Sequence, residues 1–332
     1  MRISVDNIFL GVNHSLRTDE EYVRCLDEDH HKDDKSPLSA LPTGMVSQVP
    51  FEYMHLVLLG VMKKLFSAWV YGKYSHLSKL SARSISVIST RLEALAEYCP
   101  SDFARRPKSL ATCTKYKATE YRQFLLYTGP VVTHGILYPL AYTHFLFLHA
   151  AIRISFCSAI KSTPLDTFSA FPYENNMSVF RKYCRKSDLC LQQIYNRFAE
   201  IEAHSTIENR SMNSFTHVSI QHNAGLLPSN LLSNLLRHLS NGRKLIPIPN
   251  ITLNMRDNCC ILHDMSVCIL INIIMIENSY YLILKRFLEV KNFYDVGISS
   301  LALHIFKCSS LSNSIITVGI EEVCLKGYRM PF

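Results

Sequence analysis

The sequence predicts a mixed α/β fold in which a mostly helical stretch precedes a small, mainly β module. Apolar residues recur at three- and four-residue steps through much of residues 47–212. After about residue 213, Ile and Val become frequent and the apolar runs shorten to strand length. With 332 residues, 48% of them apolar and 19% charged, the chain can bury at least one large core. We expect an irregular region over 1–46, a helical region over 47–212 and a β module over 213–332.

Five helices are expected before the β module. Their apolar residues each fall on one face, and Gly72 is a plausible stop for the first of them. Pro100 is expected to end the second, and Thr128-Gly129-Pro130 to separate the third from the fourth. The expected ranges are 53–70, 84–98, 118–128, 138–160 and 175–203.

Short β-like runs follow, and they predict a sheet or an open barrel. Polar and apolar residues alternate around Ile246 to Leu253. The expected turns are Asn241-Gly242, Asp257-Asn258 and Glu277-Asn278. The expected strands are 259–262, 267–276, 280–287 and 301–306.

Charge is distributed unevenly along the chain. The formal net charge is +8, yet residues 1–50 hold nine acids and five bases, which leaves 30 bases and 18 acids beyond them. The acidic cluster Asp27–Asp34 is most simply a solvated loop. A basic body suits a polyanionic partner such as nucleic acid, although an excess of this size is weak support.

Two compositional features bear on the compartment. No Asp, Glu, Lys or Arg occurs from Gln123 to Ile152, but Gly129-Pro130, Gly135 and Pro139 divide this run. That division favours buried helices over a membrane span, and we expect no membrane partner. Eleven cysteines are scattered without a Cys-x-x-Cys pair or another zinc spacing. Their odd number, with no signal peptide, favours a reducing compartment, either nuclear or cytoplasmic, over secretion.

The segment around Glu52-x-x-His55 is the most informative in the chain. A carboxylate and an imidazole three residues apart at a helix entrance can share one face and hold a divalent metal. Glu174 follows Phe171-Pro172-Tyr173 in a similar setting and is a second candidate ligand. The alternative is structural: both acids favour a helix N-terminus, and His55 packs at a helix edge.

Two basic blocks are candidates for contact with DNA phosphates. Six bases occur between residues 105 and 122, with aromatic residues among them. A second block follows Glu174, and on one helix Arg181 and Arg185 would share a face, as would Lys182 and Lys186. Solvated helix faces are the alternative for both blocks. The candidate phosphate contacts are Arg105, Arg106, Lys108, Lys117, Arg122, Arg181 and Lys182.

Long segments around these residues resemble one family. The run from Met45 through Glu52-Tyr-Met-His55 to Leu65 is similar to the transposase domain of CACTA/EnSpm-like DNA transposons, found in animal proteins described as transposase domain-containing. The similarity continues through Arg106-Pro107-Lys108-Ser-Leu, Lys117 to Val132, and Leu165 to Asn175, and again at Asp257-Asn-Cys-Cys and Asn292-Phe-Tyr-Asp.

The resemblance implies a partial RNase H-like core with a large helical insertion, followed by the mainly β module. In that family three acids bind two Mg²⁺ or Mn²⁺ ions about 4 Å apart and drive DNA strand cleavage and transfer. Glu52 takes the place of the second acid, normally Asp, with His55 beside it, and Glu174 matches the third. The resemblance thus makes Glu52, Glu174 and His55 the catalytic candidates, and Glu52 and Glu174 the metal ligands.

Three departures from the family argue against catalysis. The segment that carries the first acid is missing upstream, and Asp6 lies in a different context. Glu52 moves the carboxylate by about 1 Å, a displacement that can cost on the order of 100-fold in rate. Residues 151–166 look too short, as if a segment between Arg153 and Pro164 had been deleted.

The sequence therefore predicts a degenerate or domesticated DDE/D-type transposase derivative. We expect no catalysis, no bound metal and no small-molecule substrate, with DNA as the partner and self-association as a further option. The alternatives are a protein-interaction module without a DNA role, and a transposon remnant that has no function or does not fold stably.

Overall fold

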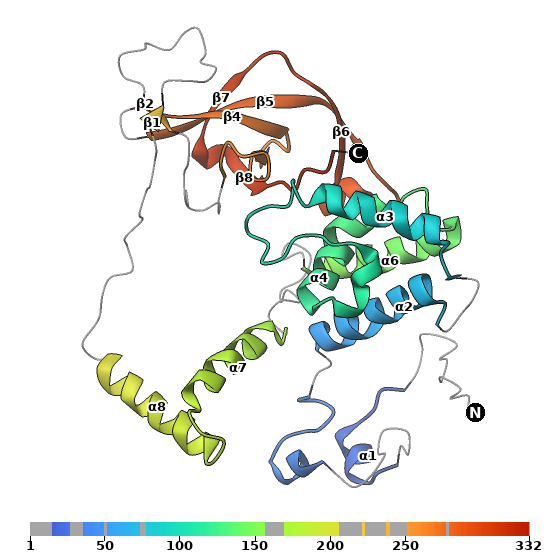
Figure 1. Ribbon diagram of the computed structural model, residues 1–332, viewed down its shortest axis with the longest axis vertical. Coiled ribbons are helices and arrows are strands. Elements are labelled where there is room, and N and C mark those ends of the chain that lie inside the picture. Colours follow the sequence, from blue (N-terminus) through green and yellow to red (C-terminus); the bar gives the residue numbers. More distant parts are fainter. Residues whose placement is uncertain are drawn as a thin grey trace. The chain divides into compact units, whose positions relative to one another are not determined.

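The structure is a computed structural model, and it describes residues 15–26, 36–49, 52–73, 78–156, 169–205, 221–222, 237–239, 251–276 and 279–331. The chain forms two compact units, Met1–Glu52 and Tyr53–Phe332. The predicted mixture is confirmed, because helices precede an antiparallel sheet (Figure 1). The acidic cluster Asp27–Asp34, the turns Asn241-Gly242 and Glu277-Asn278, and most of the shortened junction 151–166 lie outside the described residues.

The first unit, expected to be irregular, contains a short helix and a 3₁₀ turn. Helix α1 spans Asp19–Val23, and the 3₁₀ turn spans Pro37–Ala40. Thr18 and Glu21 cap α1 reciprocally, since each side chain accepts a hydrogen bond from the other's backbone N–H. The Asp19 carboxylate accepts from the backbone N–H groups of Val46 and Ser47, at 2.7 and 3.1 Å. These bonds tie the start of α1 to a segment 27 residues later.

The second unit begins with one long helix that changes its winding. Residues Met54–Met62 are π-helical, and α2 continues over Lys63–Tyr71. A Cβ on Gly60 would lie 3.1 Å from the carbonyl oxygen of His55, five residues earlier. Gly72 ends α2 at φ +69°, as its position predicts. Among the described residues, Met54–Tyr71 is also the one helical stretch whose length and hydropathy would suit a membrane, a property that core helices of soluble proteins share.

The next helices depart from expectation where a break was predicted. Helix α3 spans Ala82–Leu95 and is capped by Ser81. Helix α4, Ala118–Gln123, continues through a π-helical turn, Phe124–Thr128, into α5, Gly129–Thr133. The predicted separation at Thr128-Gly129-Pro130 is therefore wrong, because the wider turn accommodates the proline and the helix ends only at His134. Gly129 is required there, since a Cβ would lie 2.7 Å from Phe145.

Helix α6, Pro139–Phe156, completes a core built on aromatic contacts. The rings of Phe66 and Phe124 lie 4.7 Å apart edge to face, and those of Trp69 and Phe145 lie 5.6 Å apart. These side chains are fully or almost fully buried. The uncharged run Gln123–Ile152 therefore supplies core helices of the second unit.

The predicted helix 175–203 is two helices. Helix α7 spans Phe171–Tyr183 and α8 spans Cys190–Ser205. Gln193 fixes the intervening loop: its side-chain oxygen accepts from the Arg185 N–H at 2.8 Å, and its amide donates to the Asp188 carbonyl at 2.6 Å. Leu189 closes the loop at φ +53°. A continuous apolar periodicity concealed this break.

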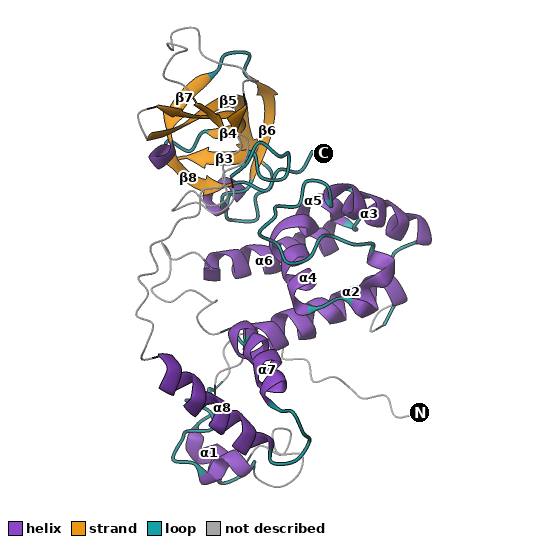
Figure 2. Cartoon of the chain, turned by 60° about the vertical axis from the view of Figure 1, so that its left-hand side comes forward, coloured by secondary structure: helices purple, strands orange, loops and turns teal. Residues whose placement is uncertain are grey.

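The described strands form one antiparallel sheet, in which β4, Val267–Ile276, pairs with β5, Ser279–Asn292. Strand β3, Cys259–Leu262, lies on the other side of β4. Figure 2 shows the sheet curling around itself. The predicted strands 259–262 and 267–276 are confirmed, and 280–287 lies within the longer β5. The remaining strands are β1 (Gln221–His222), β2 (Arg237–Leu239), β6 (Phe306–Leu311), β7 (Ile316–Gly319) and β8 (Val323–Lys326).

The predicted strand 301–306 is wrong, because a 3₁₀ turn occupies Ser300–Leu303. Ser300 is fully buried and holds this turn: its Oγ lies 2.6 Å from Asn292 Oδ1 and 2.9 Å from the carbonyl oxygen of Ile305. His304 ends the turn at φ +56°. Side-chain hydrogen bonds thus determine the local structure in a segment whose apolar content is typical of a strand.

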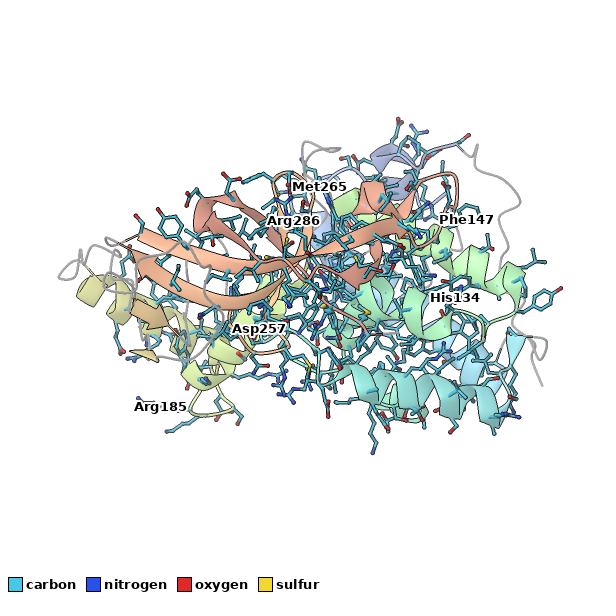
Figure 3. The ribbon with its side chains drawn as sticks, turned by 90° about the horizontal axis from the view of Figure 1, so that it is seen from above. His134, Phe147, Arg185, Asp257, Met265 and Arg286 are labelled. Carbon is cyan, nitrogen blue, oxygen red and sulfur yellow. The ribbon has the colours of Figure 1, made fainter. Side chains whose placement is uncertain are left out.

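A buried ionic cluster joins the sheet to the helices within the second unit. Lys326 Nζ at the end of β8 lies 2.5 Å from Asp257 Oδ1 and 2.6 Å from Asp102 Oδ2. Asp257 also accepts from the backbone N–H of Ser101 at 3.0 Å. Figure 3 shows Asp257 where strands and helices meet. The helical region and the sheet are therefore held together by specific contacts as well as by the chain.

Candidate nucleic-acid interface and remnant active site

Two of the three predicted catalytic residues meet in the structure. His55 lies at the start of the π-helical stretch, and Glu174 lies in the first turn of α7. His55 Nε2 is 3.2 Å from Glu174 Oε1, and more than half of each side chain is exposed. An exposed pair of this kind contributes on the order of 1 kcal/mol or less to stability. Segments 119 residues apart are therefore brought together without a large energetic contribution from this contact.

Glu52 has a different position from the one expected. The helix begins after it, with Tyr53 as the N-cap, so Glu52 and His55 do not form an i, i+3 pair on one helix. Glu52 is half-buried and is the last residue of the first unit. In the parts of the chain that the structure describes, no three His, Cys, Asp or Glu side chains gather as a metal site would require. The metal roles of Glu52 and Glu174 stay predictions.

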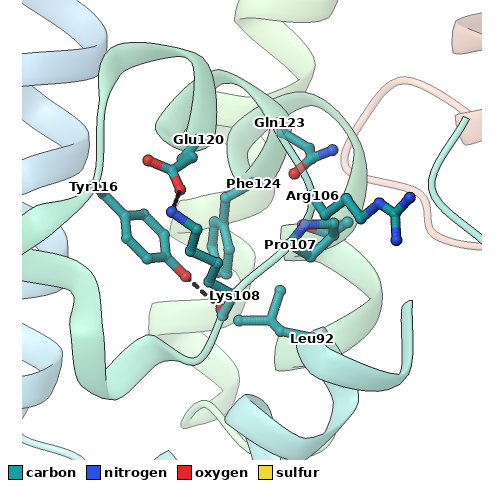
Figure 4. A pocket seen from close by; sticks show the side chains of 9 residues that line it. Leu92, Arg106, Pro107, Lys108, Tyr116, Glu120, Gln123 and Phe124 are labelled. Carbon is teal, nitrogen blue, oxygen red and sulfur yellow. Dashed lines mark hydrogen bonds and ion pairs between the residues drawn. The ribbon is translucent and has the colours of Figure 1, made fainter. Parts of the chain in front are cut away.

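Lys108 neutralises a buried carboxylate. Its Nζ lies 2.6 Å from Glu120 Oε1, and only 3% of the Glu120 side chain is exposed. Figure 4 shows the Lys108–Glu120 contact. The other carboxylate oxygen of Glu120 accepts from the backbone N–H of Lys117 at 2.7 Å and so caps α4. The Tyr116 hydroxyl donates to the Lys108 carbonyl at 2.5 Å. Lys108 therefore has a structural partner, and a phosphate would compete with Glu120 for it.

The neighbouring bases differ from Lys108 in that no described ion pair joins them to Glu120. Arg105, Arg106 and Lys117 are exposed, and Figure 4 shows the Arg106 guanidinium directed away from Glu120. The backbone below them is fixed, because Gln123 Nε2 donates to the Arg105 carbonyl at 3.2 Å. Exposed cations on a fixed backbone can contact DNA phosphates without rearrangement of the protein.

The second basic block lies at the end of α7. Arg181 and Lys182 occupy its last turn, where cations interact favourably with the helix dipole, and both are exposed. Arg185 and Lys186 lie in the following loop, and both are exposed. The predicted sharing of one helix face by residues 181 and 185, and by 182 and 186, is therefore wrong. The end of α7 and the following loop nevertheless present four exposed bases within six positions.

Arg122 is used differently from the other candidates. It is half-buried, and its guanidinium carbon lies 5.1 Å from the centroid of the Phe156 ring. Arg153, which the sequence interpretation did not select, has a matching position 5.6 Å from the Tyr127 ring centroid. These two arginines bound the uncharged run Gln123–Ile152. Their position at the two ends of this run is the sequence feature from which Arg153 could have been selected, because a lone charge at the end of an apolar segment marks where its helices reach an accessible surface.

Comparison with known proteins bears only on the sheet region. Residues 221–332 match the family model described as "Domain of unknown function (DUF8592)", which spans β1 to β8. No curated protein and no solved structure matches the chain. The sheet region therefore resembles a domain family whose description carries no activity, and the helical region is interpreted from its own residues.

Proposed function

We propose that this chain is a transposase-derived DNA-binding protein that does not cleave DNA. The observation that supports the ancestry most directly is the contact between His55 and Glu174. The resemblance to CACTA/EnSpm-like transposases makes these two residues parts of one centre, and they contact one another although 119 residues separate them. The proposal includes descent from an RNase H-like core that bound Mg²⁺ or Mn²⁺.

DNA binding is proposed for the exposed bases that do not neutralise a buried carboxylate. Arg105, Arg106, Lys117, Arg181 and Lys182 present their charge to solvent. Lys108 is the weakest candidate, since its ammonium already neutralises the buried Glu120 carboxylate. Arginine and lysine side chains bind DNA mainly by releasing counterions, which makes the affinity depend steeply on salt.

A salt titration of DNA affinity tests this proposal. Fluorescence anisotropy with a labelled duplex gives the slope of log K against log salt concentration for the wild type. A variant with Arg105, Arg106, Arg181 and Lys182 changed to Gln is expected to have a shallower slope. Its magnitude should fall by up to about 3.6, at about 0.9 for each phosphate that is no longer neutralised. The matched control changes four exposed bases elsewhere, Lys64, Lys73, Arg83 and Lys307, and is expected to keep the wild-type slope. Absence of binding at about 50 mM salt, or an affinity independent of salt, would refute DNA binding.

The absence of cleavage is tested separately. Supercoiled plasmid is incubated with the chain and Mg²⁺ or Mn²⁺, and nicking is followed on a gel. We expect no nicking by the wild type and none by Glu52→Asp, because restoring the shorter carboxylate does not supply a third acid. Nicking that is lost in Glu174→Gln would contradict this part of the proposal while supporting the ancestry.

One observation favours the alternative of a protein-interaction module. Helix α8 exposes apolar side chains at helical spacing, with exposed fractions between 41% and 82%. They are Leu191, Tyr195, Phe198 and Ile201. Tyr195→Ser with Leu191→Ser would abolish partner binding under this alternative and leave the DNA slope unchanged. Light scattering of both proteins shows whether the partner is a second copy of the chain.

A further inference from the structure

A cavity of about 280 Å³ lies where α4 and its π-helical continuation, the end of α6 and the 3₁₀ turn Ser300–Leu303 meet. Its size is just below the range for small-ligand sites, which begins at about 300 Å³. The lining combines two cations with aromatic and aliphatic surface. It includes Arg122, Leu126, Tyr127, Arg153, Phe156 and His304.

Arg153 is held in place by two contacts. Its Nη2 donates to the Leu303 carbonyl at 2.6 Å, and its guanidinium carbon lies 5.6 Å from the centroid of the Tyr127 ring. A guanidinium has five N–H donors, so one carbonyl leaves further donors for a ligand. The side chain is half-buried, which weakens solvent screening of its charge. Arg153 is therefore a positioned cation with a defined orientation.

Arg122 supplies a second cation to the same cavity. Its guanidinium carbon lies 5.1 Å from the centroid of the Phe156 ring. Two of the described residues that line the cavity are arginines, and none of them is acidic. Arginine binds phosphate through paired hydrogen bonds, so a phosphate is the group that a lining with two arginines favours.

The opposite wall is fixed by buried hydrogen bonds. Ser300 N–H donates to Asn292 Oδ1 at 2.9 Å, and the backbone N–H of Phe293 donates to Ser300 Oγ at 2.9 Å. The turn that these bonds hold ends at His304, whose φ is +56° and whose side chain is exposed. Because this wall also supplies the carbonyl that orients Arg153, the cavity is preorganised on both sides.

We propose that this cavity binds a single nucleotide through its phosphate. The phosphate lies between Arg122 and Arg153, and the base contacts the apolar surface of Leu126 and the aromatic lining. The nucleotide is either free or the 5′-phosphorylated end of a DNA strand, and only the second source rests on the proposed DNA binding. A strand end held here would give the chain a preference for broken or processed DNA over continuous duplex.

Calorimetric titration of the full chain with dAMP tests the site. Arg153→Lys keeps the charge but loses the fork, and Arg122→Gln removes one charge. Each is expected to weaken dAMP binding by at least about tenfold, as the loss of one charge-assisted hydrogen bond implies. Ala302→Phe fills the cavity without altering either charge and is expected to abolish binding, since Ala302 is an exposed part of the lining. The control Arg83→Gln, exposed on α3, is expected to bind like the wild type.

Oligonucleotides distinguish the two sources. A 5′-phosphorylated single strand that binds more tightly than its unphosphorylated form, with the difference lost in Ala302→Phe, supports the strand end. Binding of dAMP that such strands do not displace supports the free nucleotide. Inorganic phosphate that binds as tightly as dAMP would overturn the nucleotide assignment. Duplex binding with the expected salt slope, but without dAMP binding, would refute this site and leave the proposed function standing.

Discussion

Replacing Lys326 by Met removes the ammonium that neutralises a buried carboxylate. Only 6% of the Asp257 side chain and 9% of the Lys326 side chain are exposed, and their charged atoms are 2.5 Å apart. Removing one partner from a buried pair costs about 3–5 kcal/mol, because the remaining charge keeps its desolvation penalty. Asp257 would still accept one hydrogen bond from the Ser101 N–H, so we expect a loss near 3 kcal/mol.

The second carboxylate around Lys326 provides the matched comparison. Asp102 is 34% exposed, and Asp102→Asn is expected to cost about 1 kcal/mol or less. The double variant Asp257→Leu with Lys326→Met removes both buried charges and is expected to be more stable than Lys326→Met alone. The order of the three variants in free energy of unfolding tests whether burial of the remaining charge determines the loss of stability.

Urea unfolding provides the assay. The single tryptophan, Trp69, is almost fully buried in the helical core and reports its unfolding by fluorescence. Hydrogen exchange of β8 reports separately on the sheet. Equal stability of Lys326→Met and Asp102→Asn would refute the reasoning, because burial would then not distinguish the two contacts.

Three further outcomes follow from other buried or constrained positions. Burial lowers the pKa of His149 from 6.5 to about 4, so the unfolded chain binds the proton first as pH falls. The contribution to the free energy of unfolding is complete above about pH 6.5, and about 3 kcal/mol of it is lost by pH 4. In urea titrations at several pH values, His149→Phe is expected to remove this part of the pH dependence. Lys108→Met leaves the Glu120 carboxylate without its counter-charge and is expected to lower the free energy of unfolding in urea by about 3 kcal/mol. The control Lys117→Met keeps the backbone N–H that Glu120 accepts from, and it is expected to cost about 0.5 kcal/mol or less. Gly72→Ala places a side chain at φ +69° and is expected to lower stability by about 1 kcal/mol, and an unchanged melting curve would contradict this.

The sequence predicted elements whose determinants are local. The strands Cys259–Leu262 and Val267–Ile276 were found from residue type, and the end of α2 from Gly72. The misses share a different cause. The break after Tyr183 depends on bonds from Gln193 to the loop backbone, and the turn at Ser300 depends on Asn292 eight residues earlier. Periodicity and propensity do not register such contacts, because their effect appears only once the chain has folded.

The candidate site shows the same division. Motif resemblance assigned His55 and Glu174 to one centre, with Glu52 and Glu174 as its metal ligands, and the structure brings His55 and Glu174 into contact. Charge counting could not distinguish Lys108, whose ammonium neutralises the buried Glu120 carboxylate, from Arg106, whose guanidinium is directed away from Glu120. It also passed over Arg153, because a single base in an apolar segment carries little weight until its surroundings are known. The availability of a cation to a ligand therefore depends on its burial and on its partners, which charge counting does not show.

The π-helical winding of Met54–Met62 has a consequence for how this helix tolerates changes in length. A π turn takes up more residues than an α turn over the same path, so the stretch holds surplus chain next to His55. A one-residue deletion there could be absorbed by tightening to α geometry, which would leave Phe66 and Trp69 of α2 in their core positions. Because the deleted residue is the surplus one, the helix on both sides of the deletion keeps its orientation, and His55 stays near Glu174. Deletion of one residue after His55 in the π-helical stretch would therefore spare both the fold and the site, whereas a deletion within α2 would turn one side of the helix by about 100° against the other.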